Sequence, residues 1–162
     1  MMNRRAFLKL SAGALVLAAA GGLTGCGNSV DLNHPMQEVD GVVFLCDAVT
    51  NDASGGSKFK VRYKPYFAIW NKNDAPVTIP RSNITGTFTD ADGHAEPMVF
   101  TEKDLNLSAR QYTEYNGATF CLETENSVAS SWKDGSYELR ILYNNKTIVF
   151  RYDGEKMTTS IQ

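Results

Sequence analysis

The sequence predicts an all-β protein folded as an antiparallel β-sandwich of about seven strands. Apolar and polar residues alternate with a period of two in several segments, the longest spanning residues 58–73. Clusters of Gly, Asn, Asp and Pro separate these segments at short intervals, as turns separate short strands. Residues 41–162 are enough for one such domain with its own core and too few for two.

The chain begins with a motif that indicates export. Two adjacent arginines precede Phe-Leu-Lys, and this pattern resembles the twin-arginine export signals of bacteria. The motif residues are Arg4, Arg5, Phe7, Leu8 and Lys9. The apolar segment that follows, residues 10–23, is shorter than the roughly 20 residues that a membrane-spanning helix needs. We therefore interpret residues 1–25 as a cleaved signal peptide, with an uncleaved membrane helix as the alternative.

A lipid-attachment motif closes this leader. An apolar residue, two small residues and a cysteine follow one another, as in the lipobox of bacterial lipoproteins. These residues are Leu23, Thr24, Gly25 and Cys26. The resemblance implies cleavage before Cys26 and attachment of acyl chains, palmitate among them, to this residue. Residues 26–40 would then be a lipidated tether.

The expected location is extracytoplasmic, with the chain anchored to the cell membrane through the lipid on Cys26. Gly27 follows the cysteine, where an aspartate would favour retention in the inner membrane. Two locations therefore stay open: the outer face of the cytoplasmic membrane, or the outer membrane of a Gram-negative cell.

The mature chain is mildly acidic. The full chain has 16 basic and 18 acidic residues, and the leader carries three of the basic ones, Arg4, Arg5 and Lys9. Its removal leaves 13 basic residues and a net charge of −5. Such a surface disfavours nucleic acid as a partner, so the expected partners are the membrane and an unknown envelope protein or polymer.

Two cysteines remain beside the lipidated one, Cys46 and Cys121. An even pair in an oxidising compartment predicts a disulfide, which would contribute about 4 kcal/mol in the chain-entropy model. Two buried thiols are the alternative. Strand phase adds a caution, because Cys121 points away from the core if Phe120 and Leu122 face it.

The first predicted strands are the most apolar. Residues 41–49 form an apolar run typical of a buried strand, and residues 51–57 are turn formers that reverse the chain. Within residues 58–73, the odd-numbered side chains are expected to share one face. Pro65 indicates an edge position or a bulge partway along this strand.

Shorter elements follow. Strands are expected at residues 76–79, 84–89, 96–100 and 112–122, the last interrupted by Asn116-Gly117, with the turn from Asp90 to His94 joining the second and third as a hairpin. Thr101 to Asp104 has the form of a capping box and predicts one helical turn. Residues 126–132 predict another.

A hairpin closes the domain. Asn144 and Asn145 suit a two-residue turn because Asn tolerates positive φ. Pairing outward from the turn sets apolar residues opposite one another on one face and opposite charges on the other. The expected pairs are Ile141 with Ile148, Leu139 with Phe150, Tyr137 with Tyr152, and Glu138 with Arg151.

Several short motifs point to a known kind of domain. They are Phe67-Ala68-Ile69-Trp70-Asn71 leading to Pro76-Val77-Thr78-Ile79, the Asp92-Gly93 turn, Asn116-Gly117-Ala118-Thr119-Phe120, and Tyr137-Glu138-Leu139. Residues 41–152, which contain them, resemble the immunoglobulin-like domains of unknown function found in bacterial lipoproteins. The resemblance implies an immunoglobulin-like β-sandwich over residues 41–162. One departure is Ser108-Ala109-Arg110, where such domains often carry a Pro-Gly turn.

Motifs for catalysis and cofactors are absent from the sequence. There is no Gly-x-Ser-x-Gly elbow, no glycine-rich phosphate loop and no Cys-x-x-Cys. The two histidines, His34 and His94, have no ligand neighbours at metal spacing, and Asp90 and Asp92 lack the rest of an EF-hand. We therefore expect no catalytic residue, no metal and no cofactor, and hence no enzyme.

One surface is a candidate for binding. The even-numbered side chains of the long strand form a basic stripe that ends in aromatic rings. Its residues are Lys60, Arg62, Lys64, Tyr66 and Trp70. Such a face could attract an anionic envelope polymer by charge and hold it by stacking. A solvated outer face whose lysines discourage edge pairing is the alternative.

Two functions are therefore open. The first is a membrane-anchored, extracytoplasmic lipoprotein that acts as a non-catalytic binding or interaction module. The second is an accessory lipoprotein that assists the assembly or regulation of an exported enzyme, which the twin-arginine route would suit.

Overall fold

The computed structural model describes residues 35–54, 59–128 and 134–162. The predictions for the export motif, the lipobox, Cys26 and His34 lie outside the described residues, as does most of the helical turn expected at 126–132. Pro35–Gln162 forms one compact unit. Within its described residues, no helix is long and apolar enough to cross a membrane.

Short strands make up most of the described chain. In the first half they are β1 (Met36–Val39), β2 (Val42–Ser54), β3 (Lys60–Asn71), β4 (Val77–Ile79), β5 (Ile84–Thr89) and β6 (Ala95–Phe100). In the second half they are β7 (Leu105–Leu107), β8 (Tyr112–Tyr115), β9 (Leu122–Thr124), β10 (Ser136–Tyr143), β11 (Lys146–Tyr152) and β12 (Met157–Ile161). A 3-10 turn, η2 (Arg81–Asn83), precedes β5.

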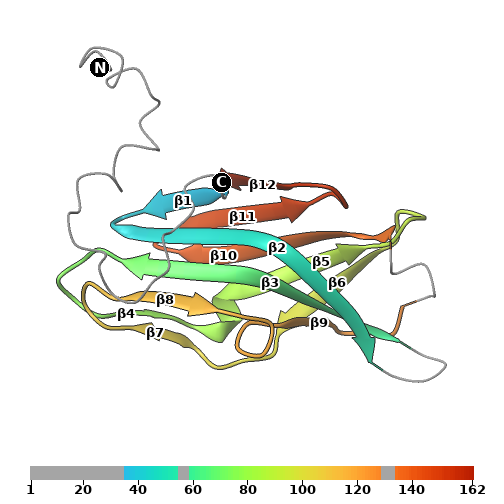
Figure 1. The fold of residues 1–162 in the computed structure, drawn as a ribbon, viewed down its shortest axis with the longest axis horizontal. Helices are drawn as coiled ribbons and strands as arrows, with labels where there is room; N and C mark the ends of the chain where they lie inside the picture. Colours follow the sequence, from blue (N-terminus) through green and yellow to red (C-terminus); the bar gives the residue numbers. More distant parts are fainter. Residues whose placement is uncertain (1–34, 55–58, 129–133) are drawn as a thin grey trace, which may run out of the picture. The chain divides into compact units, whose positions relative to one another are not determined.

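The strands form one large antiparallel sheet and one small one. The path of the large sheet is β1-β2-β3-β9-β6-β5-β10-β11-β12, and β8 joins it by pairing with β3. Strands β4 and β7 form a separate two-stranded sheet. Figure 1 shows β1 beside β12, so the large sheet curls until its two end strands meet. The prediction of an all-β antiparallel fold is confirmed, and the curled sheet is nearly closed like a barrel.

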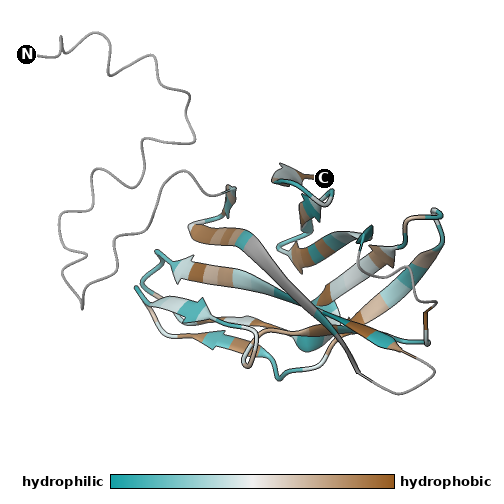
Figure 2. Ribbon diagram, turned by 45° about the vertical axis from the view of Figure 1, so that its right-hand side comes forward, coloured by the Kyte–Doolittle hydropathy of each residue, from teal (hydrophilic) through white to brown (hydrophobic). Residues whose placement is uncertain are grey.

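The core fills the inside of this curled sheet. Aromatic rings dominate it: Tyr63 stacks on Tyr137 with ring centroids 4.7 Å apart, and Phe67 stacks on Phe120 at 4.2 Å. Along β3 the side chains alternate between buried and partly exposed, as the sequence predicts for the segment, except that Ala68 is also buried. Figure 2 shows the same alternation as brown apolar bands separated by teal and pale ones along the strands. Each large side chain buried here contributes about 1.5–3 kcal/mol.

The closing hairpin has the predicted register. Residues Tyr137, Leu139 and Ile141 of β10 pair with Tyr152, Phe150 and Ile148 of β11. Asn144 and Asn145 both have positive φ, at 47° and 60°, which is the backbone of the predicted two-residue turn. On the outer face, Arg151 donates to Glu138 at 2.6 Å.

Strand β2 is longer than the sequence predicts. The expected turn at residues 51–57 is wrong in its first half, because β2 continues to Ser54 and pairs with β3 up to Lys60. Asp52 lies opposite Arg62 and bonds to both Arg62 and Lys64. Cross-strand pairing of this kind outweighs the low strand propensity of an Asn-Asp sequence.

Pro65 lies at a bulge in the middle of the sheet. The register between β2 and β3 shifts between Asp47 and Val49, at the point where Pro65 and Tyr66 face them. Strand β3 as a whole has β2 on one side and both β8 and β9 on the other, so it is not an edge strand, and the register shift opposite Pro65 puts the extra residue of the bulge in β2. The proline falls between the residues of β3 that pair with β9 and those that pair with β8.

The helical turn predicted from Thr101 to Asp104 is not formed. Instead, the backbone and hydroxyl of Thr101 both donate to the carbonyl of Cys121, at 3.0 and 3.1 Å. The carboxylate of Asp104 accepts from the backbone of Arg81. The capping residues therefore bond to distant loops, and these tertiary contacts replace the local ones that a helix would use.

A buried amide connects two loops beside the small sheet. Asn71, at the end of β3, is fully buried, and its side-chain nitrogen donates to the carbonyls of Ala75 at 2.7 Å and Ser108 at 2.9 Å. Its side-chain oxygen accepts from the backbone of Asn73 at 3.0 Å. One side chain thereby supplies hydrogen-bond partners to three backbone groups that lie outside the strands.

Replacing this amide tests its role in stability. We expect Asn71→Ala to lower the free energy of unfolding by about 3 kcal/mol, because the backbone groups that it bonds lose their partner. Asn106→Ala is the matched control: Asn106 is exposed and bonds to Thr78 and Asp104, so its loss should cost within about 0.5 kcal/mol. Denaturant unfolding measures both, and equal losses would contradict the assignment.

Candidate functional site

The basic half of the predicted stripe is neutralised by acidic residues from neighbouring strands. Lys60 forms an ion pair with Glu123 of β9 at 3.4 Å. Arg62 and Lys64 share the carboxylate of Asp52 on β2, with Arg62 at 2.6 Å. Burial alone would raise the pKa of Asp52, but the hydrogen bonds from Lys64 and Arg62 outweigh it and hold that pKa below its usual value. The carboxyl therefore stays ionised and balances the stripe.

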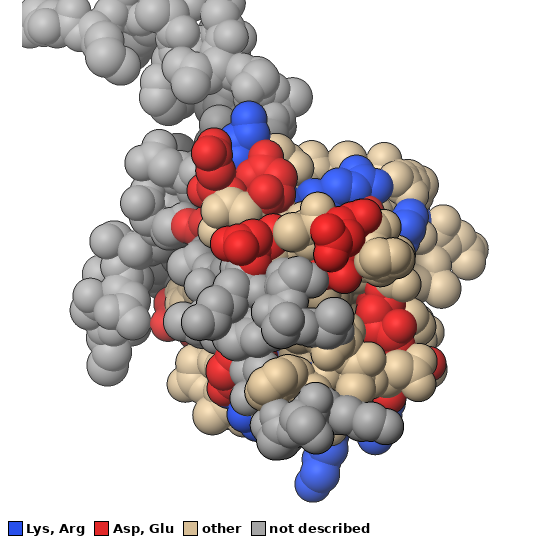
Figure 3. Space-filling view, turned by 90° about the vertical axis from the view of Figure 1, so that its right-hand side faces the viewer, with Lys and Arg blue, Asp and Glu red and all other residues tan. Residues whose placement is uncertain are grey.

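This pairing changes the interpretation of the stripe. An anionic polymer would have to compete with Asp52 and Glu123 for the same cations, so the basic half offers little net attraction. On the end of the domain shown in Figure 3, red acidic groups lie beside blue basic ones, and the visible described surface has no continuous basic patch. Sequence analysis did not predict the ion pairs of Asp52, because Asp52 falls in a segment that was expected to be a turn.

The aromatic half of the stripe is extended by a neighbouring strand. Trp70 of β3 lies directly opposite Tyr112 of β8. The hydroxyl of Tyr112 donates to Glu114 at 3.0 Å and is also hydrogen-bonded to Tyr66. We call Tyr66, Trp70 and Tyr112 the aromatic face. All three side chains are partly exposed, so their rings are available to a partner.

Polar groups surround these rings. Lys72 lies over the Trp70 ring, 5.6 Å from its centroid, and also donates to Glu38 at 2.9 Å. Burial, followed by the hydrogen bonds with Tyr66 and Glu114, raises the pKa of Tyr112 well above its usual value. Tyr112 thus remains a neutral hydroxyl. Sequence analysis did not identify Tyr112, because the order of the strands in the sheet, and not spacing along the chain, places it beside Trp70.

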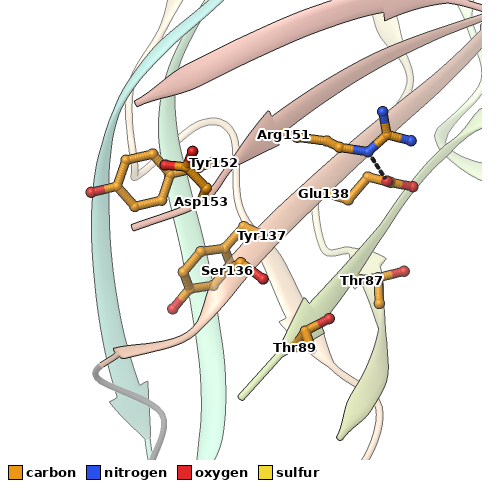
Figure 4. Close-up of a pocket in the computed structure, with 8 residues that line it drawn as sticks. All are labelled: Thr87, Thr89, Ser136, Tyr137, Glu138, Arg151, Tyr152 and Asp153. Atoms are coloured by element: carbon orange, nitrogen blue, oxygen red, sulfur yellow. Dashed lines mark hydrogen bonds and ion pairs between the residues drawn. The ribbon is translucent and has the colours of Figure 1, made fainter. Parts of the chain in front are cut away.

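A shallow pocket lies on another part of the sheet. It encloses about 270 Å³ against strands β5, β10 and β11 (Figure 4). The lining residues are Thr87, Thr89, Ser136, Tyr137, Glu138, Arg151, Tyr152 and Asp153. Glu138 is held by Arg151 at 2.6 Å and by Arg140 at 3.1 Å. The other carboxylate of the lining, Asp153, accepts from the backbones of Glu155 at 3.0 Å and Lys156 at 2.9 Å, so both possible general bases of the pocket already have partners.

The turn between β5 and β6 brings three possible ligand groups together. The side-chain atoms of Asp90, Asp92 and His94 lie within 4.8 Å of one another. Asp90, however, already accepts from the backbones of Asp92 at 3.0 Å and His94 at 2.9 Å. The bond from the His94 backbone is the main cause that lowers the pKa of the Asp90 carboxyl. These groups therefore stabilise the hairpin turn, with Gly93 at a φ of 88°.

The disulfide predicted between Cys46 and Cys121 is not formed. Both are free and buried. Cys46 faces the core and contacts the Tyr63 hydroxyl at 3.8 Å. Phe120 and Leu122 belong to the core cluster, so Cys121 between them points to the opposite side of the sheet. The alternation of side chains, which was already the caution against the bridge, therefore places the two sulfur atoms on opposite sides of the sheet.

Thiol reactivity tests this correction. Burial raises the pKa of Cys46 to about 12, with the Tyr63 hydrogen bond opposing part of the shift. Only the thiolate reacts with iodoacetamide, so alkylation of Cys46 in the folded protein should stay slow at every pH below about 12. Without reductant, unfolding should expose both thiols and add two alkyl groups by mass. Cys46→Ser should add one. If the native protein takes up no alkyl group after unfolding while Cys46→Ser takes up one, the disulfide exists.

Comparisons with known proteins identify no relative by sequence. No protein-family model matches the chain, and no curated protein matches it. Among solved structures, the chain is similar to YcdA, a candidate lipoprotein of Bacillus subtilis, with 16% identity and a TM-score of 0.48. The match covers 75% of this chain and 39% of YcdA. We draw neither fold nor function from a likeness of this degree.

Proposed function

We propose that the protein is an exported lipoprotein, anchored outside the cytoplasm by acyl chains on Cys26, whose β domain is a non-catalytic binding module. The observation that carries this proposal is the order of the two leader motifs, with Arg4 and Arg5 followed by the lipobox that ends at Cys26. Strand β1 begins at Met36, so a short tether separates the lipid from the domain.

The surface of the domain supports binding more than catalysis. In the pocket, Glu138 is bound by two arginines and Asp153 by two backbone amides, so both carboxylates that could act as a base already have partners. The turn carboxylate Asp90 is occupied by backbone amides. The aromatic face, in contrast, presents partly exposed rings on a rigid sheet, which is a common basis for recognition.

The relation to immunoglobulin-like domains is part of this proposal. The antiparallel strands, the β10–β11 hairpin and the aromatic core support it. The continuous path from β1 to β12 gives a more closed arrangement than two separate layers. A variant of that sandwich with a curled main sheet accounts for both observations.

Removal of the lipidated cysteine tests the anchor. We expect the native protein in the membrane fraction to begin at Cys26 and to carry acyl mass. Cys26→Ser should lack that mass and leave the membrane fraction, because lipid supplies the anchor. Cys121→Ser is the matched cysteine control and should stay acylated. Native protein that still begins at Met1, or that lacks acyl mass, would disprove the proposal.

The twin-arginine motif favours a second candidate, an accessory lipoprotein for an exported enzyme. Twin-arginine export carries folded chains, including many enzymes that receive a cofactor in the cytoplasm. Crosslinking in intact cells separates the two candidates. A binding module should give crosslinks to envelope polymer or to several surface proteins, whereas an accessory protein should give one exported enzyme in fixed proportion. Crosslinks to one exported enzyme in fixed proportion would contradict the binding module and support the accessory lipoprotein.

A further inference from the structure

We propose that the aromatic face, Tyr66, Trp70 and Tyr112, is a binding site for a neutral saccharide chain of the cell envelope. This inference rests on the proposed function, because it names the ligand class of the binding module. It replaces the anionic polymer that the sequence suggested for the same strand.

The rings form a row on one side of the sheet. Trp70 and Tyr112 are direct cross-strand neighbours, and Tyr66 lies four residues from Trp70 on the same face of β3. Four residues of strand span about 13 Å. The Tyr112 hydroxyl reaches toward Tyr66 and Glu114, so its ring extends along the strand over Ala68, which lies opposite Glu114 and is fully buried. The three rings therefore cover a length suited to a short run of sugar units.

Hydrogen-bonding groups lie at the edges of these rings. Tyr66, Tyr112 and Glu114 form one connected network, with 3.0 Å between Tyr112 and Glu114. A hydroxyl both donates and accepts, and a carboxylate offers several acceptor positions, so the network can bond further hydroxyls without losing its own bonds. A pyranose ring has an apolar face for stacking and a rim of hydroxyls, which matches rings surrounded by such groups.

The charges around the face are balanced. Lys72 is paired with Glu38 at one end, and Lys64 is paired with Asp52 at the other. A polyanion would be repelled by the carboxylate of Glu114. It would gain little from the two lysines, because each of them already has an acidic partner. A proline-rich peptide is the other chain that stacks on aromatic rings, but such peptides dock in grooves, and a flat strand face with polar edges fits a polyhydroxyl chain better.

Calorimetric titration of the acylated protein in detergent tests the inference. The probes are neutral tetrasaccharides of glucose and of N-acetylglucosamine, a polyuronate and a proline-rich peptide. We expect at least one neutral tetrasaccharide to bind in preference to the polyuronate. Trp70→Ala should weaken that binding about tenfold, a loss of about 1.4 kcal/mol that lies within the range of an aromatic stacking contact. Tyr112→Phe should weaken it about fivefold through the lost hydroxyl.

The controls separate binding from folding. Lys60→Ser changes the same face of β3 at the far end, beside Glu123, and should leave affinity within about twofold. Trp70→Phe keeps a ring and should retain binding within about threefold even if Trp70→Ala unfolds.

Several results would overturn the inference: no neutral tetrasaccharide binds, the polyuronate or the peptide binds more tightly, or the aromatic variants bind like the native protein. The acyl mass on Cys26 is measured independently of these binding results. A failure of the saccharide inference is therefore distinguishable from a failure of the lipoprotein proposal.

Discussion

The alternation of side chains along β3 is the constraint on which the rest of the domain depends. Its odd-numbered residues from Val61 to Ile69 enter the core, and its backbone pairs with β2, β8 and β9. A slip of one residue would turn Tyr63 and Phe67 outward and bring Arg62 and Tyr66 into the core. The register of β3 therefore fixes the aromatic core and the aromatic face together.

Polar residues within the sheet are satisfied by partners that lie far away in the sequence. Asp52 is held by cations across the strand pair, Asn71 by the carbonyls of two loops, and Glu138 by two arginines. Of the three, only Asn71 is fully buried, so its amide is the one that would be costly to leave without a partner. The same pairing removes the net charge from the β3 stripe, which is why its aromatic half is the better candidate for recognition.

Local patterns predicted the parts of the fold that depend on neighbouring residues. The turn at Asn144 and Asn145 and the Ile141–Ile148 pair follow from turn chemistry and from a period of two. Prediction was wrong where a distant strand outweighed local preference. Strand β2 continues through Asp52 because β3 supplies cations, and Thr101 bonds to Cys121 and starts no helix. For the site, Tyr66 and Trp70 could be found from spacing, but Tyr112 could not.

The sequence by itself predicts an export leader and a lipid-attachment cysteine at Cys26, and it determined an all-β domain and the phase of its main strands, because each of these depends on adjacent residues. Tertiary structure decided which strands meet. It brought Tyr112 beside Trp70, put Asp52 against Arg62, and placed Cys46 and Cys121 on opposite sides of the sheet. The physical reason is that sheet order brings residues together across long stretches of chain, where sequence periodicity gives the face of a side chain but not its neighbour.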